Sequence, residues 1–67
     1  MRITVNGKET FAEEGTSVQE LLVQMRLDSR KIAVERNLEI VAKSAYQSTM
    51  LEDGDQLEIV HFIGGGQ

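Results

Sequence analysis

The chain has 67 residues, of which 40% are hydrophobic and 27% are charged, and this composition is typical of one small soluble domain. Eleven acidic residues against seven basic ones give a net charge of -4, which disfavours nucleic acid as a partner because its binding requires cations that neutralise phosphates. The sequence has no cysteine, which excludes disulfides, thiolate metal sites and a cysteine nucleophile.

The opening segment, MRITVN, alternates apolar and polar residues, and a period of two predicts a strand with one buried face. Asn6-Gly7 follows at once, and this dipeptide favours the positive backbone angles of a tight hairpin turn. The segment KETFA then returns as a second antiparallel strand, in which we expect Phe11 to contact the core.

A helix begins after Ser17, whose hydroxyl can cap the first free amides, and Glu20 completes a capping box three residues later. Apolar residues at helical spacing then predict one buried stripe, in which methionine serves as core filler. The stripe consists of Val18, Leu21, Leu22 and Met25, with Leu27 at its end.

KIAVERN is typical of a third strand with Ile32 and Val34 facing inward, and LEIVA continues it or pairs with it through a turn near Asn37-Leu38. KSAYQSTMLE is weakly patterned, so we expect irregular structure there with a short strand around residues 50 and 51. Asp53-Gly54-Asp55 predicts a turn, because a calcium-binding EF-hand loop needs twelve spaced positions.

The last strand is QLEIVHF, and the helix must bury its apolar face against the sheet. The expected architecture is therefore a two-layer α+β domain. With no apolar run near the roughly 20 residues that cross a bilayer and no apolar leader, we expect a cytoplasmic protein with no membrane partner.

Catalytic machinery is not predicted within the chain. His61 is the only histidine, so a histidine-based metal cluster or proton relay cannot be assembled, and we interpret it as an alternating residue of the last strand. The carboxylates are scattered, and the glycines open no helix that could bind phosphate. We expect neither an enzyme nor a metal site.

The last strand is expected to divide its residues between two faces. If the helix covers Leu57 and Ile59, then Val60 and Phe62 stand on the open face, and Ile63 adds an apolar residue beyond them. These residues are either scattered surface hydrophobics, which need no special account, or a patch that docks a partner.

The chain ends in IGGGQ, and Gly64, Gly65 and Gly66 contribute no side chain to a fold. Glycines without β-carbons can thread a narrow channel, and they leave a terminal carboxylate unhindered. The sequence thus predicts a domain over residues 1–63, which gives affinity, and a flexible tail over residues 64–67, which delivers a reactive carbon into another protein's active site.

The segments VNGKE, TSVQELL, AVERNLEIVAKS and LEDGDQLEIVHFIGGG together resemble the thiamine-biosynthesis sulfur-carrier proteins of the ThiS type. DGD and terminal glycines recur in the related small subunits of molybdopterin synthase, but the combination is more specific. The resemblance implies the ubiquitin-like β-grasp fold, a mixed sheet of four to five strands with one helix across one face. This fold agrees with the element order above.

The resemblance also implies a mechanism in which the chain is a carrier and co-substrate. The Gly66 carboxylate would be adenylated by an E1-like adenylyltransferase of the ThiF type, which would hold the ATP and magnesium, so the chain itself binds no cofactor. A persulfide sulfur donor would then give a thiocarboxylate, from which a ThiG-type thiazole synthase takes sulfur. Gly64, Gly65 and Gly66 would thread the partner's active site. Val60, Phe62 and Ile63 would match the partner-docking surface.

Gln67 departs from the family pattern, which ends in Gly-Gly. A processing protease could remove it, the activating enzyme could tolerate it, or it could be a remnant of expression; trimming is the favoured reading. Two other functions stay open. The carrier could serve another pathway, such as molybdopterin, an amino acid or another thiolated metabolite, or the chain could be a ubiquitin-like protein modifier. The remaining alternative is a β-grasp interaction module whose C-terminal tail has no function.

Overall fold

The structure is a computed structural model, and it describes residues 1–62. Within them five strands and one α-helix occur in the order β1 (Arg2–Val5), β2 (Lys8–Phe11), α1 (Val18–Gln24), β3 (Ile32–Arg36), β4 (Glu39–Val41) and β5 (Gln56–His61). Two short 3-10 helices, η1 (Ser29–Lys31) and η2 (Lys43–Ala45), flank the β3–β4 pair.

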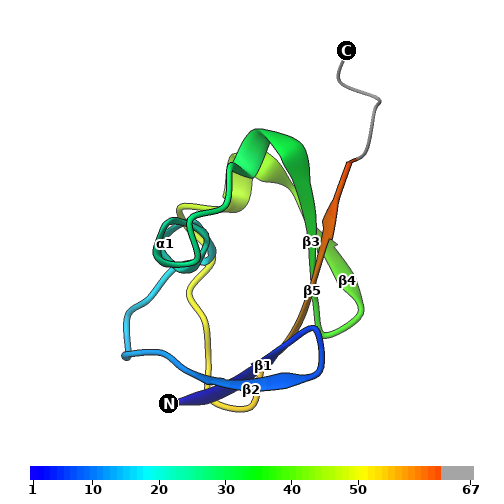
Figure 1. Cartoon of the computed structure of the whole chain (residues 1–67). Coiled ribbons are helices and arrows are strands. Elements are labelled where there is room, and N and C mark those ends of the chain that lie inside the picture. The colour runs from blue at the N-terminus through cyan, green and yellow to red at the C-terminus, as the bar shows by residue number, and fades with distance from the viewer. Residues whose placement is uncertain (63–67) are drawn as a thin grey trace.

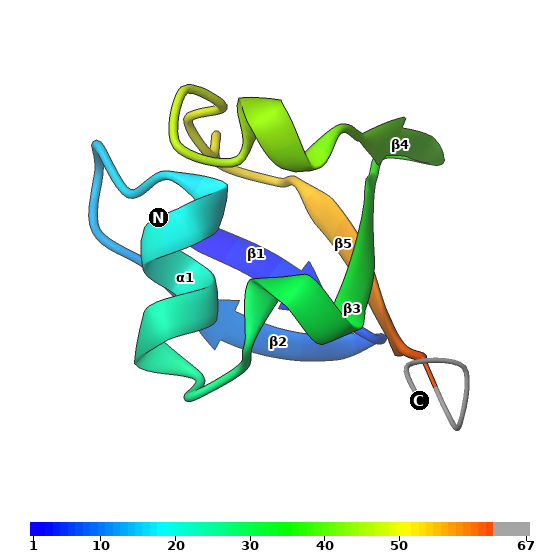
Figure 2. The ribbon, with the colours of Figure 1, turned by 90° about the horizontal axis from the view of Figure 1, so that it is seen from above.

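The strands form one mixed sheet in the order β2-β1-β5-β3-β4, in which β1 and β5 run parallel and the other neighbours antiparallel. The sheet curves around α1, which forms a second layer against one face (Figures 1 and 2). The predicted two-layer α+β architecture is confirmed. The core between the layers is made of Ile3, Val5, Ala12, Val18, Leu21, Leu22, Ile32, Val34, Tyr46, Leu51, Leu57 and Ile59.

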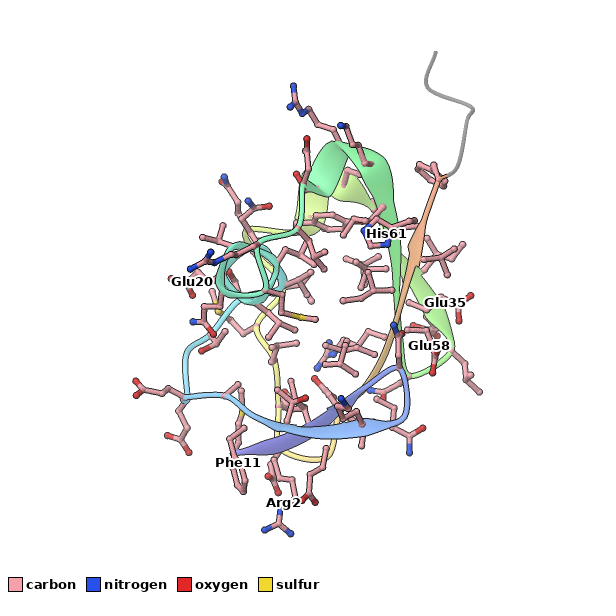
Figure 3. All side chains as sticks on the ribbon, in the orientation of Figure 1. Arg2, Phe11, Glu20, Glu35, Glu58 and His61 are labelled. Atoms are coloured by element: carbon pink, nitrogen blue, oxygen red, sulfur yellow. The ribbon has the colours of Figure 1, made fainter. Side chains whose placement is uncertain are left out.

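The first hairpin has the predicted turn, with φ of 52° at Asn6 and 80° at Gly7. The prediction that Phe11 contacts the core is wrong, because Phe11 is 70% exposed. Phe11 pairs with Arg2 across the hairpin, so both side chains lie on the face of the sheet away from α1 (Figure 3). The Arg2 guanidinium lies 5.3 Å from the centroid of the Phe11 ring, and Ala12 takes the buried place.

Helix α1 begins with the predicted capping box. The Glu20 amide donates to Ser17 Oγ at 3.1 Å, and the Ser17 amide donates to Glu20 Oε1 at 3.0 Å. The predicted stripe is only partly right: its first three members are buried, but Met25 is exposed. The helix ends at Gln24 and Met25 is its C-cap, so Met25 has left the buried stripe. Leu27 is half-buried against the core.

The strands after the helix follow the predicted pattern. Ile32 and Val34 are buried, and β3 pairs with β4 through a turn at Asn37 and Leu38, both of which have positive φ. The short strand expected around Met50 and Leu51 is reduced to one isolated bridge between Met50 and Ser17. No helix in residues 1–62 is long and apolar enough to cross a membrane.

Asp55, predicted only as a turn residue, anchors a hydrogen-bond network at the start of β5. Its carboxylate accepts from Arg36 Nε at 2.8 Å, from Asn37 Nδ2 at 3.0 Å and from the Glu52 amide at 2.8 Å. Burial alone would raise the pKa of Asp55, but these hydrogen bonds outweigh it and hold the pKa below its ordinary value. The network joins the β3–β4 turn to β5.

Candidate functional site

Strand β5 divides its side chains between two environments, as the alternation predicts. Leu57 and Ile59 are buried beneath α1, whereas Val60 is 59% exposed and Phe62 is 55% exposed. We call the side of the sheet away from α1 the open face. Val60 therefore stands on the open face, as predicted, and Phe62 is exposed just beyond the end of β5.

The open face carries further apolar side chains at its two sides. Ile40 projects from the edge strand β4, and Phe11 projects from the opposite edge strand β2. Val60 pairs with Ala33 of β3, whose small side chain is half-buried. Ile40 pairs with Glu35, which pairs with Glu58, so Ile40 lies in the row of side chains next to that of Ala33 and Val60.

Two carboxylates lie beside these apolar residues. Glu35 and Glu58 are paired directly across β3 and β5, and both project from the open face (Figure 3). Like charges in this position destabilise a sheet. Neither forms an ion pair with a cation of residues 1–62. Alternation along β5 puts Glu58 on the same face as Val60, but only the register reveals Glu35 as its neighbour.

The end of β5 is held by contacts that sequence reasoning did not predict. The Phe62 amide donates to the Lys31 carbonyl at 2.9 Å, which extends the pairing one residue beyond His61. Lys43 Nζ lies 5.4 Å from the centroid of the Phe62 ring. The same ammonium donates to two carbonyls, at 2.7 Å to Ser29 and at 2.6 Å to Ile32.

Other candidate chemistry is not supported by the arrangement. His61 is an exposed residue of β5 and pairs with Ile32, as expected for an alternating strand residue. Within the described part of the chain, no group of three or more His, Cys, Asp or Glu side chains could hold a metal ion.

The remaining predicted site residues lie outside the described residues. They are Ile63 of the docking patch, the glycines Gly64, Gly65 and Gly66, and the possible processing site Gln67. The described structure thus contains the surface that leads to the predicted reactive end, and the reactive end itself stays a prediction.

Comparison with known proteins identifies the family. The ThiS family sequence profile matches residues 1–66. The chain belongs to the ThiS family. It is 42% identical over 65 residues to the sulfur carrier protein ThiS of Bacillus subtilis, with 96% of this chain and 98% of that protein covered.

A crystal structure supports the same assignment at the level of the fold. The thiamine biosynthesis protein ThiS of Geobacter metallireducens superposes with a TM-score of 0.82 at 35% identity, covering 98% of this chain and 100% of that one. The ThiS-type, ubiquitin-like β-grasp fold that the resemblance implied is confirmed.

Two longer relatives are thiazole synthases. The chain is 53% identical over 66 residues to the enzyme of Paramagnetospirillum magneticum, and the match covers 98% of the chain and 20% of that protein. It is 45% identical over 67 residues to the enzyme of Magnetococcus marinus, and that match covers 100% of the chain and 21% of that protein. The chain spans about a fifth of the length of these two relatives.

Proposed function

We propose that this chain is a sulfur carrier for the synthesis of the thiazole ring of thiamine, with the sulfur held as a thiocarboxylate on Gly66. Membership of the ThiS family extends through Gly66 and supports this assignment. The observation that carries the proposal is the open face. Val60 and Phe62 are exposed within four residues of Gly64, so a partner that docks there lies close in sequence to the glycines.

The open face has the properties of a docking surface. Exposed apolar side chains on a sheet bury favourably against a partner, at about 25 cal/mol per Å² of apolar area removed from water. Glu35 and Glu58, which form no ion pair within residues 1–62, would favour a partner surface that combines apolar and basic side chains. Two carboxylates directly opposite each other do not stabilise the isolated domain, because they repel each other, and a cation of the partner would relieve this repulsion.

In this proposal residues 1–63 form the docking domain, and residues 64–67 form the tail that enters the partner's active site. The chain is a co-substrate rather than an enzyme. An E1-like, ThiF-type adenylyltransferase in the cytoplasm supplies ATP and magnesium. The Gly66 carboxylate attacks the α-phosphate of ATP, pyrophosphate leaves, and an acyl-adenylate forms.

Sulfur then replaces the adenylate. The terminal sulfur of a persulfide donor attacks the acyl carbon and AMP leaves, after which a thiol cleaves the sulfur–sulfur bond and releases the thiocarboxylate. A ThiG-type thiazole synthase accepts the sulfur and returns the carboxylate. Gly64 and Gly65 keep the approach free of side chains, since only hydrogen occupies the β-position.

Gln67 has to be accounted for in this chemistry, because its peptide bond to Gly66 occupies the carboxyl group that would be activated. We propose that a protease removes Gln67 before activation and thereby exposes the Gly66 carboxylate. A tail that is activated without trimming would instead carry the adenylate on Gln67.

Intact mass spectrometry tests the proposal. The full chain and a chain ending at Gly66 are each incubated with ATP, magnesium, the ThiF-type enzyme and a persulfide donor. We expect the chain ending at Gly66 to gain the mass of one sulfur in exchange for one oxygen, with fragment ions placing the change on Gly66. The full chain should stay unchanged until it is trimmed.

A variant of the reacting residue provides the control. Gly66→Ala in the shortened chain should leave the thermal unfolding midpoint unchanged and reduce loading sharply, because a methyl group obstructs the channel. Loading of neither form would refute the carrier function. Conjugates of higher mass on lysines of other proteins would indicate a ubiquitin-like modifier instead.

A further inference from the structure

Lys43 connects three separate segments at the end of β5. Its ammonium donates to the carbonyls of Ser29 in η1 and of Ile32, the first residue of β3. A lysine ammonium has three donors, so these two acceptors fix its position and leave one N–H. The lysine itself belongs to η2, which follows β4.

The fixed ammonium lies against two aromatic rings. Its nitrogen is 5.9 Å from the centroid of Tyr46 and 5.4 Å from the centroid of Phe62, within the range of cation–π attraction. Tyr46 is buried in the core, which anchors the segment that carries Lys43. Phe62 is 55% exposed and lies outside the core cluster, so the contact with Lys43 is made by a ring that the core does not bury.

The main chain of Phe62 is held by the same part of the molecule. Its amide donates to the carbonyl of Lys31, which lies between the two carbonyls that bind Lys43. The backbone of Phe62 is thus bound to the junction of η1 and β3, and its ring lies against Lys43, whose ammonium is bound to the same junction. The next residues in the sequence lead to the glycines that carry the proposed chemistry.

A capping role alone does not account for this arrangement. A cation near the last carbonyls of a helix is stabilising, and Lys43 has that effect on η1. Capping needs no contact with Phe62, however, and an exposed ring adds little to the core. The contact between Lys43 and the ring acts on Phe62, the last residue before the C-terminal segment.

We propose that Lys43 is a positioning residue for sulfur loading: by holding the Phe62 ring, it fixes the point and direction at which the C-terminal segment leaves the open face. The inference rests on the proposed carrier function and names the residue that aims the tail. A docked carrier with a correctly aimed tail reacts faster, because small misplacements of a reacting group are costly in rate.

Steady-state kinetics of adenylation by the ThiF-type enzyme, with the carrier ending at Gly66 as the varied substrate, test the proposal. We expect Lys43→Met to lower kcat about tenfold while KM changes less than about twofold, since Val60 still docks. Lys43→Arg should restore most of kcat, because a guanidinium keeps the charge and the contact with the ring. Lys8→Met, which removes a lysine from β2, is the matched control and should behave as wild type.

A double-mutant cycle with Phe62→Leu separates aiming from capping. If Lys43 acts through the ring, Lys43→Met should have little further effect on kcat in the Phe62→Leu background. A loss of kcat that is undiminished in that background, or a Lys43→Met protein that is folded and adenylated at the wild-type rate, would overturn the proposal.

A structural measurement on the full chain does not depend on any activity. The ring current of Phe62 should shift the proton resonances of the Lys43 ε-methylene upfield, and Phe62→Leu should reduce that shift. Lys43→Met should increase the fast backbone motion of residues after Phe62 in nitrogen-15 relaxation. If Lys43→Met leaves the relaxation unchanged, the inference is overturned, even when the wild-type carrier is loaded with sulfur. If the relaxation changes as expected but the wild-type carrier is not loaded, only the carrier function is refuted.

Discussion

Replacing Asp55 with alanine should destabilise the protein by about 2–4 kcal/mol. The side chain is only 6% exposed, and its two oxygens accept from Arg36, Asn37 and the Glu52 amide. Breaking a buried ion pair by removing one partner costs roughly 3–5 kcal/mol, and the partial exposure of Arg36 reduces that figure. A domain of this size has a free energy of unfolding of about 3–10 kcal/mol, so the loss is a large share of it.

Urea unfolding at neutral pH measures this cost, with Asp53→Ala as the matched control in the same turn. Asp53 is exposed and accepts one hydrogen bond, from the Arg2 amide at 2.8 Å, so its removal should cost about 0.5–1.5 kcal/mol. A cost for Asp55→Ala no greater than that of Asp53→Ala would refute the reasoning, because the network would then add nothing to the pairing of the strands.

The same carboxylate makes a prediction about pH. The pKa of Asp55 is lowered in the folded protein from an ordinary value of 3.8, so its stabilisation is fully present above about pH 4. The stabilisation should be lost as the pH falls below 3.8 toward the folded pKa. Asp55→Asn should therefore show a weaker dependence of unfolding free energy on pH between about pH 4 and pH 2. An unchanged dependence would assign the acid sensitivity to other carboxyls.

Three further substitutions test the core and the open face. Leu22→Ala should cost about 2–5 kcal/mol in urea unfolding, because Leu22 is fully buried, and a cost below 1 kcal/mol would contradict its place in the core. Val60→Ser should weaken binding of the thiazole synthase in calorimetry. Val23→Ser should not, because Val23 lies on α1, although its exposure is similar (62% against 59% for Val60). Equal effects of the two substitutions would exclude the open face as the docking surface. Glu58→Gln should raise the unfolding free energy by about 0.2–1 kcal/mol by relieving repulsion with Glu35, and should reduce the salt dependence of partner binding; a fall in stability would contradict the like-charge argument.

The elements with strong local signals were predictable from the sequence. Asn6-Gly7 specified the first hairpin, and the Ser17–Glu20 box specified the start of α1, because in both cases neighbouring residues determine the geometry. The two faces of β5 could be predicted from alternation alone, because successive side chains of a strand point to opposite faces of the sheet.

What could not be predicted depends on pairing between distant segments. Phe11 is an apolar residue on a strand, and only its register with Arg2 places it on the open face. Met25 fits the helical stripe, but the point at which α1 ends removes it from the core. The contact of Lys43 with Phe62 joins residues 19 positions apart through two carbonyls, and no short sequence pattern indicates it.

The division of β5 between core and partner depends on its register, to which the first hairpin turn contributes alongside the pairing with β1 and β3. Asn6 Oδ1 accepts from the Ile59 amide at 2.7 Å, and Asn6 Nδ2 donates to the Ile59 carbonyl at 3.2 Å. A slip of one residue would turn Ile59 outward and bury Val60, since every side chain would exchange faces. The side chain that shapes the turn therefore also helps to keep Val60 on the open face. The local signal that made the hairpin predictable thus helps to set the surface on which the proposed function depends.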